Sequence, residues 1–305
     1  MARQPLAGRM GRGDSGPPCP EASEPSQFLG RLEGLTLAYG RRRAQGAGAG
    51  RDLGFGRGQE FVGYRPYRPG EDARALDFSL LARLGKPFVR VMRPEAHTAV
   101  TILLDRSASM AVGPPGKWQS AVELALALGH LWGSVGARVR WLHGSNPGSI
   151  ESLRMSRPVD AAACRRALFA TRAEGGLGLR DLLTALGSGD DHVVLIGDLF
   201  DLQPRDLEPW LRARSHWSLV RVLGPVETAP PVGQAVVWLD PEDSRQRMVC
   251  DGGADRWSYL QALADQDEAW QSWCGRHRIG YHVHLAGTPF EDALLGRGPH
   301  QGLAL

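Results

Sequence analysis

From residue 97 onward, the chain alternates between two patterns of hydrophobic and polar positions. Short apolar runs at 98–104 and 192–197 are typical of strands that are buried on both faces. The segment 117–134 instead repeats its apolar residues, from Trp118 to Trp132, at the spacing of an amphipathic helix. Strands that alternate with helices in this way predict a mostly parallel sheet with helices on both faces, which is a doubly wound α/β domain.

Other segments extend the same alternation to residue 295. We expect further strands at 137–143, 150–155, 216–223 and 279–286, and further helices at 159–170, 179–186, 204–214, 255–278 and near 290–295. Two apolar segments that flank the polar stretch PEDSR predict a β-hairpin inserted at about 235–251. Three tryptophans of the long helix, Trp257, Trp270 and Trp273, are expected to lie in the core.

The two ends of the chain lack the pattern of a folded segment. Residues 1–26 are rich in Gly, Pro and Ser, which predicts a disordered tail. We divide the rest into an N-terminal segment at 27–96 that packs on the main domain, the main domain at 97–295, and a C-terminal tail at 296–305. The glycine-rich stretch from Gly46 to Gly58 predicts an irregular loop, because its glycines do not follow the pattern of a phosphate-binding turn.

Composition narrows the class of protein. A chain of 305 residues with 42% hydrophobic residues can supply a sizeable core. No run approaches the roughly 18 apolar residues of a membrane span, and the first residues lack the apolar centre of a signal peptide. We therefore expect a cytoplasmic protein without an integral membrane segment. The four cysteines are scattered without CxxC spacing, which predicts buried reduced thiols rather than a zinc cluster or a disulfide framework.

Basic side chains clearly outnumber acidic ones between residues 41 and 93, although the net charge of the whole chain is only +3. Such a segment is suited to face an acidic partner. Nearly all basic residues of the chain are arginines, with Lys86 and Lys117 the only lysines, so the excess follows the general composition of the chain. Because no nucleic-acid-binding motif accompanies the charge, we expect no nucleic-acid partner.

Two aspartates that follow buried strands are the first candidates for a functional site. Asp105 ends the run VTILLD, and Asp198 ends the run HVVLIGD. In an open parallel sheet, ligands bind beyond the carboxyl ends of the strands where the strand order reverses, and we expect these two strands to be neighbours there. Ser107 and Ser109 alternate with Asp105, so one loop can aim three side-chain oxygens at a centre that suits Mg²⁺ or Mn²⁺.

Other interpretations of this Asp-x-Ser-x-Ser loop stay open. Asp after a strand and Ser before a helix commonly bond to backbone N–H groups, so a turn or a helix cap needs no metal. An aspartyl-phosphate phosphatase would need a second carboxylate where Ser107 stands, and a serine hydrolase would need glycines around its nucleophile. The remaining enzymatic alternative is a metal-dependent phosphoester hydrolase in which Asp105 and Asp198 share the cation, although no histidine is well placed as its general base.

The strand, the loop DRSASM, the following helix and the later LIGDLFD together resemble a von Willebrand factor type A domain with its metal-ion-dependent adhesion site. Upstream, the stretch from Gly58 to Arg83 is similar to the signature of a bacterial domain-of-unknown-function family, DUF58. The similar elements are Glu60-Phe61, Arg65-Pro66-Tyr67, the string from Gly70 to Arg74, and Asp77-Phe78 through Ala82-Arg83. The resemblance extends from about residue 35 to residue 295.

This resemblance implies a type A fold with a hairpin insertion and no known catalytic activity. It also implies frequent pairing with MoxR-type AAA+ ATPases in chaperone-like assembly, so that the chain would act as an adaptor. The implied metal ligands are Asp105, Ser107, Ser109 and Asp198. One departure concerns this site: Leu177 stands where similar domains have a Thr that donates an oxygen to the metal, and the sequence does not place Thr171 or Asp181 as a substitute.

The upstream signature also has the composition of a contact surface. Its prolines restrict the preceding residues to extended conformations, and tyrosine and arginine are favoured at protein interfaces. The alternative is an ion-paired clasp onto the sheet. We predict partner contacts by Arg65, Tyr67, Asp72, Arg74, Asp77 and Arg83. The leading hypothesis is therefore a non-enzymatic interaction module that binds an acidic group on a protein partner, with Mg²⁺ or Mn²⁺ at an adhesion-type site.

Overall fold

The structure is a computed structural model that describes residues 25–44, 59–67, 76–94, 99–114, 116–146, 148–155, 160–187, 192–211, 216–230, 236–239, 247–250 and 254–295. Some expectations fall outside this part of the chain. They concern the tail at 1–24, the glycine-rich loop at 46–58, the C-terminal tail at 296–305, Asp72 and Arg74.

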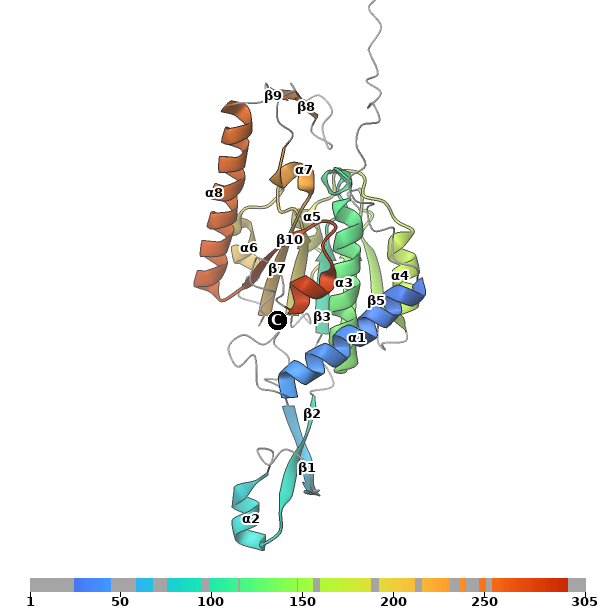
Figure 1. Cartoon of the computed structure of the whole chain (residues 1–305), viewed down its shortest axis with the longest axis vertical. Helices are drawn as coiled ribbons and strands as arrows, with labels where there is room; N and C mark the ends of the chain where they lie inside the picture. Colours follow the sequence, from blue (N-terminus) through green and yellow to red (C-terminus); the bar gives the residue numbers. More distant parts are fainter. Residues whose placement is uncertain are drawn as a thin grey trace, which may run out of the picture.

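A six-stranded sheet lies at the centre of the main domain (Figure 1). Its strands follow the order β10 (Gly280–Leu285), β7 (His216–Leu223), β6 (His192–Gly197), β3 (Ala99–Leu104), β4 (Arg138–His143) and β5 (Glu151–Met155). Neighbouring strands are parallel, except that the edge strand β5 runs antiparallel to β4. Strand β3 pairs with both β4 and β6, so the strands that end in the two candidate aspartates are neighbours, as predicted.

Successive residues of the central strands face opposite sides of the sheet, and each side has its own core. On one side, Ile102, Val194 and Val220 pack with α1 (Pro25–Ala44), α3 (Lys117–Ser134), α4 (Ala161–Phe169) and α9 (Phe290–Leu295). On the other side, Leu103, Leu195 and Leu219 pack with α5 (Leu179–Leu183), α6 (Pro204–Leu211) and α8 (Ala254–His277). The doubly wound α/β fold is therefore confirmed (Figure 1).

Helix α1 is an element that the sequence did not predict. It begins at Pro25, so the last two residues of the expected tail are helical. Phe28, Leu32 and Leu35 form a buried stripe against α3 and α4. The stripe is short, and glycines and arginines interrupt it, so the sequence pattern gave no clear helical signal here.

The tryptophans of α8 correct a second expectation. Trp270 and Trp273 are buried, as predicted, but Trp257 is 68% exposed. The first turns of α8 contain mostly exposed positions, whereas its last turns pack against β10 and the core. The aromatic series therefore enters the core only in the second half of the helix.

Strands β1 (Gln59–Pro66) and β2 (Phe88–Pro94) pair with each other in an antiparallel sheet of their own, and α2 (Phe78–Leu84) lies in the connection between them. We call this unit, residues 59–67 and 76–94, the arm. Figure 1 places it beyond the amino ends of the central strands. The sequence predicted a contact surface here but not its hairpin or its helix.

Two further expectations about local structure are confirmed, namely the hairpin insertion and the buried free thiols. Strands β8 (Val236–Leu239) and β9 (Arg247–Cys250) pair antiparallel and form the predicted hairpin insertion. Cys164 and Cys274 are free and buried. Within the described ranges, no helix combines the length and the apolar character that crossing a membrane requires.

Candidate functional site

The Asp-x-Ser-x-Ser loop leaves the carboxyl end of β3 and continues into the short helix η2 (Ala108–Ala111). Asp105 is buried, and its Oδ1 accepts a hydrogen bond from the Ser107 N–H at 2.9 Å. The hydroxyl oxygens of Ser107 and Ser109 lie 2.9 Å apart. The loop thus brings together three of the predicted site residues, and it does so through a side-chain-to-backbone turn of the kind that the metal-free interpretation expected.

Asp198, the fourth predicted ligand, follows the neighbouring strand β6 and is also buried. Its Oδ1 accepts a hydrogen bond from the Phe200 N–H at 3.2 Å, and its Oδ2 accepts one from Lys117 Nζ at 2.8 Å. Lys117 is the first residue of α3, and its Nζ also donates to Glu227 Oε1 at 2.5 Å. Two carboxylates at the ends of β6 and β7 therefore share one buried ammonium group.

Local backbone features hold these groups in place. Glu227 lies in α7 (Pro225–Thr228), which starts directly after β7, and its Oε2 accepts a hydrogen bond from the Gly224 N–H at 2.7 Å. Glu227 thus caps its own helix while it binds the lysine. Gly197 precedes Asp198, and a Cβ at this glycine would lie 2.6 Å from the Cβ of Asp105. Only glycine allows the two strand ends to approach this closely.

The Gly-Gly-Leu loop lies next to the Asp-x-Ser-x-Ser loop, as the type A resemblance implies. The Ala108 N–H donates to the Gly175 carbonyl at 2.9 Å. Gly175 has a φ of 79°, and a Cβ there would lie 1.9 Å from the Ser145 carbonyl oxygen, so the loop requires a glycine. Leu177, however, is fully buried and belongs to the apolar cluster that includes Leu103. The loop is in the expected place, but its key side chain packs in the core.

The two substitute donors considered from the sequence are engaged differently. Thr171 Oγ1 donates to the Leu168 carbonyl at 2.6 Å, and the Thr171 carbonyl accepts a hydrogen bond from the Trp118 indole at 3.2 Å. Asp181 is exposed on α5. Thr171 therefore has a local role that needs no metal ion.

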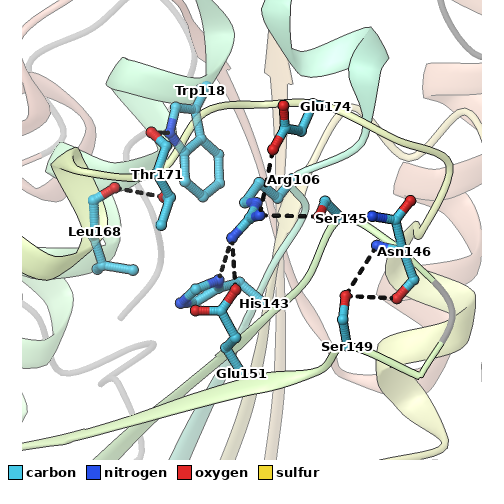
Figure 2. Close-up of polar contacts among 10 residues, drawn as sticks. All are labelled: Arg106, Trp118, His143, Ser145, Asn146, Ser149, Glu151, Leu168, Thr171 and Glu174. Carbon is cyan, nitrogen blue, oxygen red and sulfur yellow. Dashed lines mark hydrogen bonds and ion pairs between the residues drawn. The ribbon is translucent and has the colours of Figure 1, made fainter.

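Arg106, the second residue of the loop DRSASM, points into a separate polar cluster (Figure 2). Its Nη1 donates to Glu151 Oε1 at 3.0 Å and lies 3.3 Å from His143 Nδ1. Its Nη2 donates to the Ser145 hydroxyl at 3.0 Å and lies 3.9 Å from Glu174 Oε1. These partners come from β4, β5 and two loops, so the guanidinium fixes the positions of the segments around the site.

A strained turn brings an aromatic ring to the surface of the site. Leu199 has a φ of 60°, a left-handed conformation that is unusual for leucine, and its side chain is fully buried. The next residue, Phe200, is 43% exposed. Its ring centre lies 5.3 Å from Lys117 Nζ and 5.4 Å from the guanidinium carbon of Arg221, within the range of cation–π attraction. The surface over the carboxylates is therefore an aromatic ring backed by two buried cations.

Burial and neighbouring charges shift the acidity of the site. Burial raises the pKa of Asp105 well above its usual range, and the charges of Asp198 and Asp201 raise it further. Burial also raises the pKa of Asp201. Burial alone would lower the pKa of Lys117, but the attraction of Asp198 and Glu227 outweighs it, so the pKa of Lys117 is raised. Lys117 therefore stays positively charged at physiological pH.

The predicted ligands fit a divalent cation only in part. Carboxylate and hydroxyl oxygens are suitable donors for Mg²⁺ or Mn²⁺. Asp198, however, already accepts hydrogen bonds at both oxygens, one of them from an ammonium group, and Leu177 occupies the place of a Thr oxygen. In the part of the chain that the structure describes, no three His, Cys, Asp or Glu side chains are arranged to hold a metal. The residues present do not complete a metal site of the type A kind.

The described residues of the predicted partner surface lie on the arm, beyond the amino ends of the central strands (Figure 1), whereas Asp105 follows the carboxyl end of β3. Arg65 and Arg83 are exposed. Tyr67 is partly buried, and its N–H donates to the Pro87 carbonyl at 3.0 Å. The two groups of site residues that the sequence predicted therefore belong to two separate surfaces.

Asp77 has a structural role in the arm. It is buried, and its Oδ1 accepts hydrogen bonds from the N–H groups of Ser79 and Leu80 at the start of α2. The Tyr64 hydroxyl donates to its Oδ2 at 3.3 Å. Asp77 thus caps the helix and fixes the helix to the hairpin, so its carboxylate has a structural role in the arm.

Reasoning from the sequence missed three charged residues near Asp198 at the carboxyl ends of the strands. Each of them nevertheless has a recognisable feature in the sequence. Lys117 is one of only two lysines and starts a helix whose apolar residues recur at helical spacing. Glu227 follows Gly-Pro directly after a buried strand, which is a pattern of a helix start. Arg221 interrupts an apolar strand, and it is fully buried with its Nε bonded to the Asp198 carbonyl at 3.2 Å. A charge in a buried element requires a buried partner.

The sequence matches one protein family over most of its length. Residues 63–269 match the family described as "Protein of unknown function DUF58". A comparison with curated proteins found no match.

Several solved structures are similar to the chain at low identity. They include the conserved hypothetical protein BatB from Bacteroides thetaiotaomicron (14% identity, 61% of this chain and 90% of that chain covered, TM-score 0.36). An aerotolerance-related membrane protein from Bacteroides fragilis covers 64% of this chain and 94% of its own, with 12% identity and a TM-score of 0.37. The SpRpn10 VWA domain covers 66% and 95%, with 8% identity and a TM-score of 0.35.

Proposed function

This chain belongs to the DUF58 family, and from that premise we propose that it is a non-enzymatic protein-interaction module. The proposed partner is a MoxR-type AAA+ ATPase, for which the chain acts as an adaptor in chaperone-like assembly. The proposed location of the complex is the cytoplasm.

One observation carries this proposal: the arm exposes several large apolar side chains on one small unit. Phe78 is 67% exposed, Leu84 is 58% exposed and Tyr64 is 45% exposed. Helix α2 has no buried residue, so its apolar side chains do not serve the core of the protein. Single exposed apolar residues are ordinary, but a group of them is typical of a surface that binds another protein.

Charge defines the kind of partner surface that fits the arm. Arg65, Arg83 and Lys86 are also exposed on the arm, whereas the Asp77 carboxylate is buried as a helix cap. Arginine and exposed aromatic residues are typical of interface centres and rims. The arm is therefore suited to an acidic surface with an apolar centre, and we propose that the ATPase presents such a surface.

The metal ion of the adhesion-type site stays a prediction. Its ligands would be Asp105, Ser107, Ser109 and Asp198, with Mg²⁺ or Mn²⁺ as the cation. The proposed contact does not depend on this ion, because the arm lies at the opposite end of the sheet (Figure 1).

The test is the affinity of the purified chain for the MoxR-type AAA+ ATPase of the same genome, measured by biolayer interferometry. Phe78→Ser removes an aromatic ring of the arm that is 67% exposed. An aromatic residue at the centre of an interface commonly contributes about 2 kcal/mol or more, so we expect a loss of affinity of about tenfold or more. Arg83→Glu reverses a charge and is expected to slow association.

Trp257→Ser is the matched control, because Trp257 is as exposed as Phe78 but lies on α8. It should bind like the wild type. Equal binding by the Phe78→Ser protein, or no binding of the wild-type chain to the ATPase, would contradict the proposal.

The phosphoester hydrolase is the less favoured alternative. It requires a general base near Asp105 and Asp198, but the closest described contact of His143 is with Arg106, and His192 lies at the amino end of β6 beside Ser218. Hydrolysis of p-nitrophenyl phosphate by the wild type that disappears in Asp105→Ala would favour the hydrolase over the interaction module.

A further inference from the structure

A buried lysine lies between the carboxyl ends of two neighbouring strands. Lys117 is fully buried, and its Nζ lies 2.8 Å from Asp198 Oδ2 and 2.5 Å from Glu227 Oε1. Asp198 follows β6, and Glu227 lies in α7 just after β7. In a doubly wound sheet, this edge is where ligands and ions bind.

A buried ammonium group is unfavourable at this position unless specific partner groups stabilise its charge. Moving an ammonium group out of water is costly. Lys117 is also the first residue of α3, where the helix dipole disfavours positive charge. The chain otherwise uses arginine almost everywhere, with Lys86 the only other lysine. The two buried carboxylates are the groups that offset these costs.

Each of the two carboxylates uses one oxygen to accept a backbone hydrogen bond. Its other oxygen accepts a hydrogen bond from Lys117. Asp198 Oδ1 accepts from the Phe200 N–H, and Glu227 Oε2 accepts from the Gly224 N–H. The other oxygen of each carboxylate faces the ammonium group. An ammonium is compact and directs three donors at separate acceptors, which suits this space better than a planar guanidinium.

We infer that the Lys117 ammonium is the resident cation of this site, in place of the divalent ion that the type A resemblance implies. Asp198, the implied ligand from the second strand, is then already paired with a cation and engaged at both oxygens. Leu177 agrees with this assignment, because a cation held by Asp198 and Glu227 requires no oxygen from the loop that contains Leu177. The inference goes beyond the proposed function and does not rest on it.

The experiment compares thermal unfolding of the wild type, Lys117→Met and Lys86→Met, each in EDTA and in Mg²⁺ or Mn²⁺. Met keeps the length of the side chain and removes its charge. The wild type should melt at the same temperature in EDTA and in either metal. Removing one partner of a buried ion pair should lower the melting temperature of Lys117→Met by roughly 10 °C in EDTA. Metal should restore part of this loss, because two buried carboxylates are then left without a cation.

Lys86→Met is the matched control, since it removes the other, exposed lysine, and it should behave like the wild type in all conditions. A metal-dependent rise in the melting temperature of the wild type would overturn the inference. So would a Lys117→Met protein that is destabilised but does not respond to metal, because Lys117 would then be an ordinary structural ion pair. If Lys117→Met does not fold, Mn²⁺ titration of the wild type followed by electron paramagnetic resonance decides: no saturable binding supports the inference, and binding of one ion per chain overturns it.

Discussion

Replacing Leu177 by Thr supplies the oxygen that a type A metal site would use, and we expect it to destabilise the protein instead of creating a metal site. Leu177 is fully buried in the apolar cluster that includes Leu103, Leu142 and Leu179. The substitution removes apolar surface worth about 2 kcal/mol. It also places a hydroxyl group among apolar side chains, which costs roughly 1–3 kcal/mol more when the hydroxyl has no partner. The free energy of unfolding should therefore fall by about 3 kcal/mol.

Urea unfolding followed by circular dichroism, in EDTA and in Mg²⁺, measures this change. Leu177→Val is the control, because it removes apolar volume without adding a donor. We expect Leu177→Thr to be the less stable of the two variants, and neither variant to gain stability from Mg²⁺. A Leu177→Thr protein that Mg²⁺ stabilises while Leu177→Val stays unchanged would refute the reasoning, since the loop would then reach a metal ion.

Two further predictions concern His192, which is buried in the central sheet, and Gly175, which lies in the loop beside the site. Burial, assisted by the charge of His216, lowers the pKa of His192 to about 3. Because this folded-state pKa lies below the unfolded value near 6.5, the stability from neutral His192 is complete above pH 6.5 and is lost as the pH falls from there towards 3. Between pH 7 and pH 5 this loss amounts to about 2 kcal/mol. The difference in unfolding free energy between the wild type and His192→Gln should therefore shrink by that amount in urea unfolding. An unchanged difference would show that His192 is not buried in its neutral form. Gly175→Ala should cost at least about 2 kcal/mol, because it strains a positive φ and pushes a Cβ into the Ser145 carbonyl, whereas Gly176→Ala, with open space around it, should be nearly neutral. Equal melting temperatures for the two alanine variants would contradict this account of the loop.

The order of strands and helices was accessible from the sequence because each element of the main domain carries its own periodic signal. The helix from Lys117 to Ser134 was predicted with both of its ends, since its apolar residues from Trp118 to Trp132 recur at helical spacing. Helix α1 was missed because its stripe of three apolar residues depends on α3 and α4 for burial. A short stripe among glycines and arginines gives no signal until the tertiary contacts are known.

The candidate site was predicted in part for a similar reason. Asp105 and Asp198 end apolar runs, so their positions at one edge of the sheet follow from the strand pattern. Lys117 and Glu227 lie 110 residues apart. Their contact arises only when β7 and α3 are assembled, and no local pattern encodes it. The partner of a buried charge is known only from the tertiary structure, even when the charged residue itself stands out in the sequence.

The most direct test of the account is hydrogen–deuterium exchange of the chain, alone and bound to the MoxR-type AAA+ ATPase. Amide protection maps the contact without any substitution. We predict that binding slows exchange in the arm, at residues 76–89, and leaves the loops at 105–111 and 198–203 unchanged. Protection of those two loops with none in the arm, or no protection in any of these segments, would contradict the account.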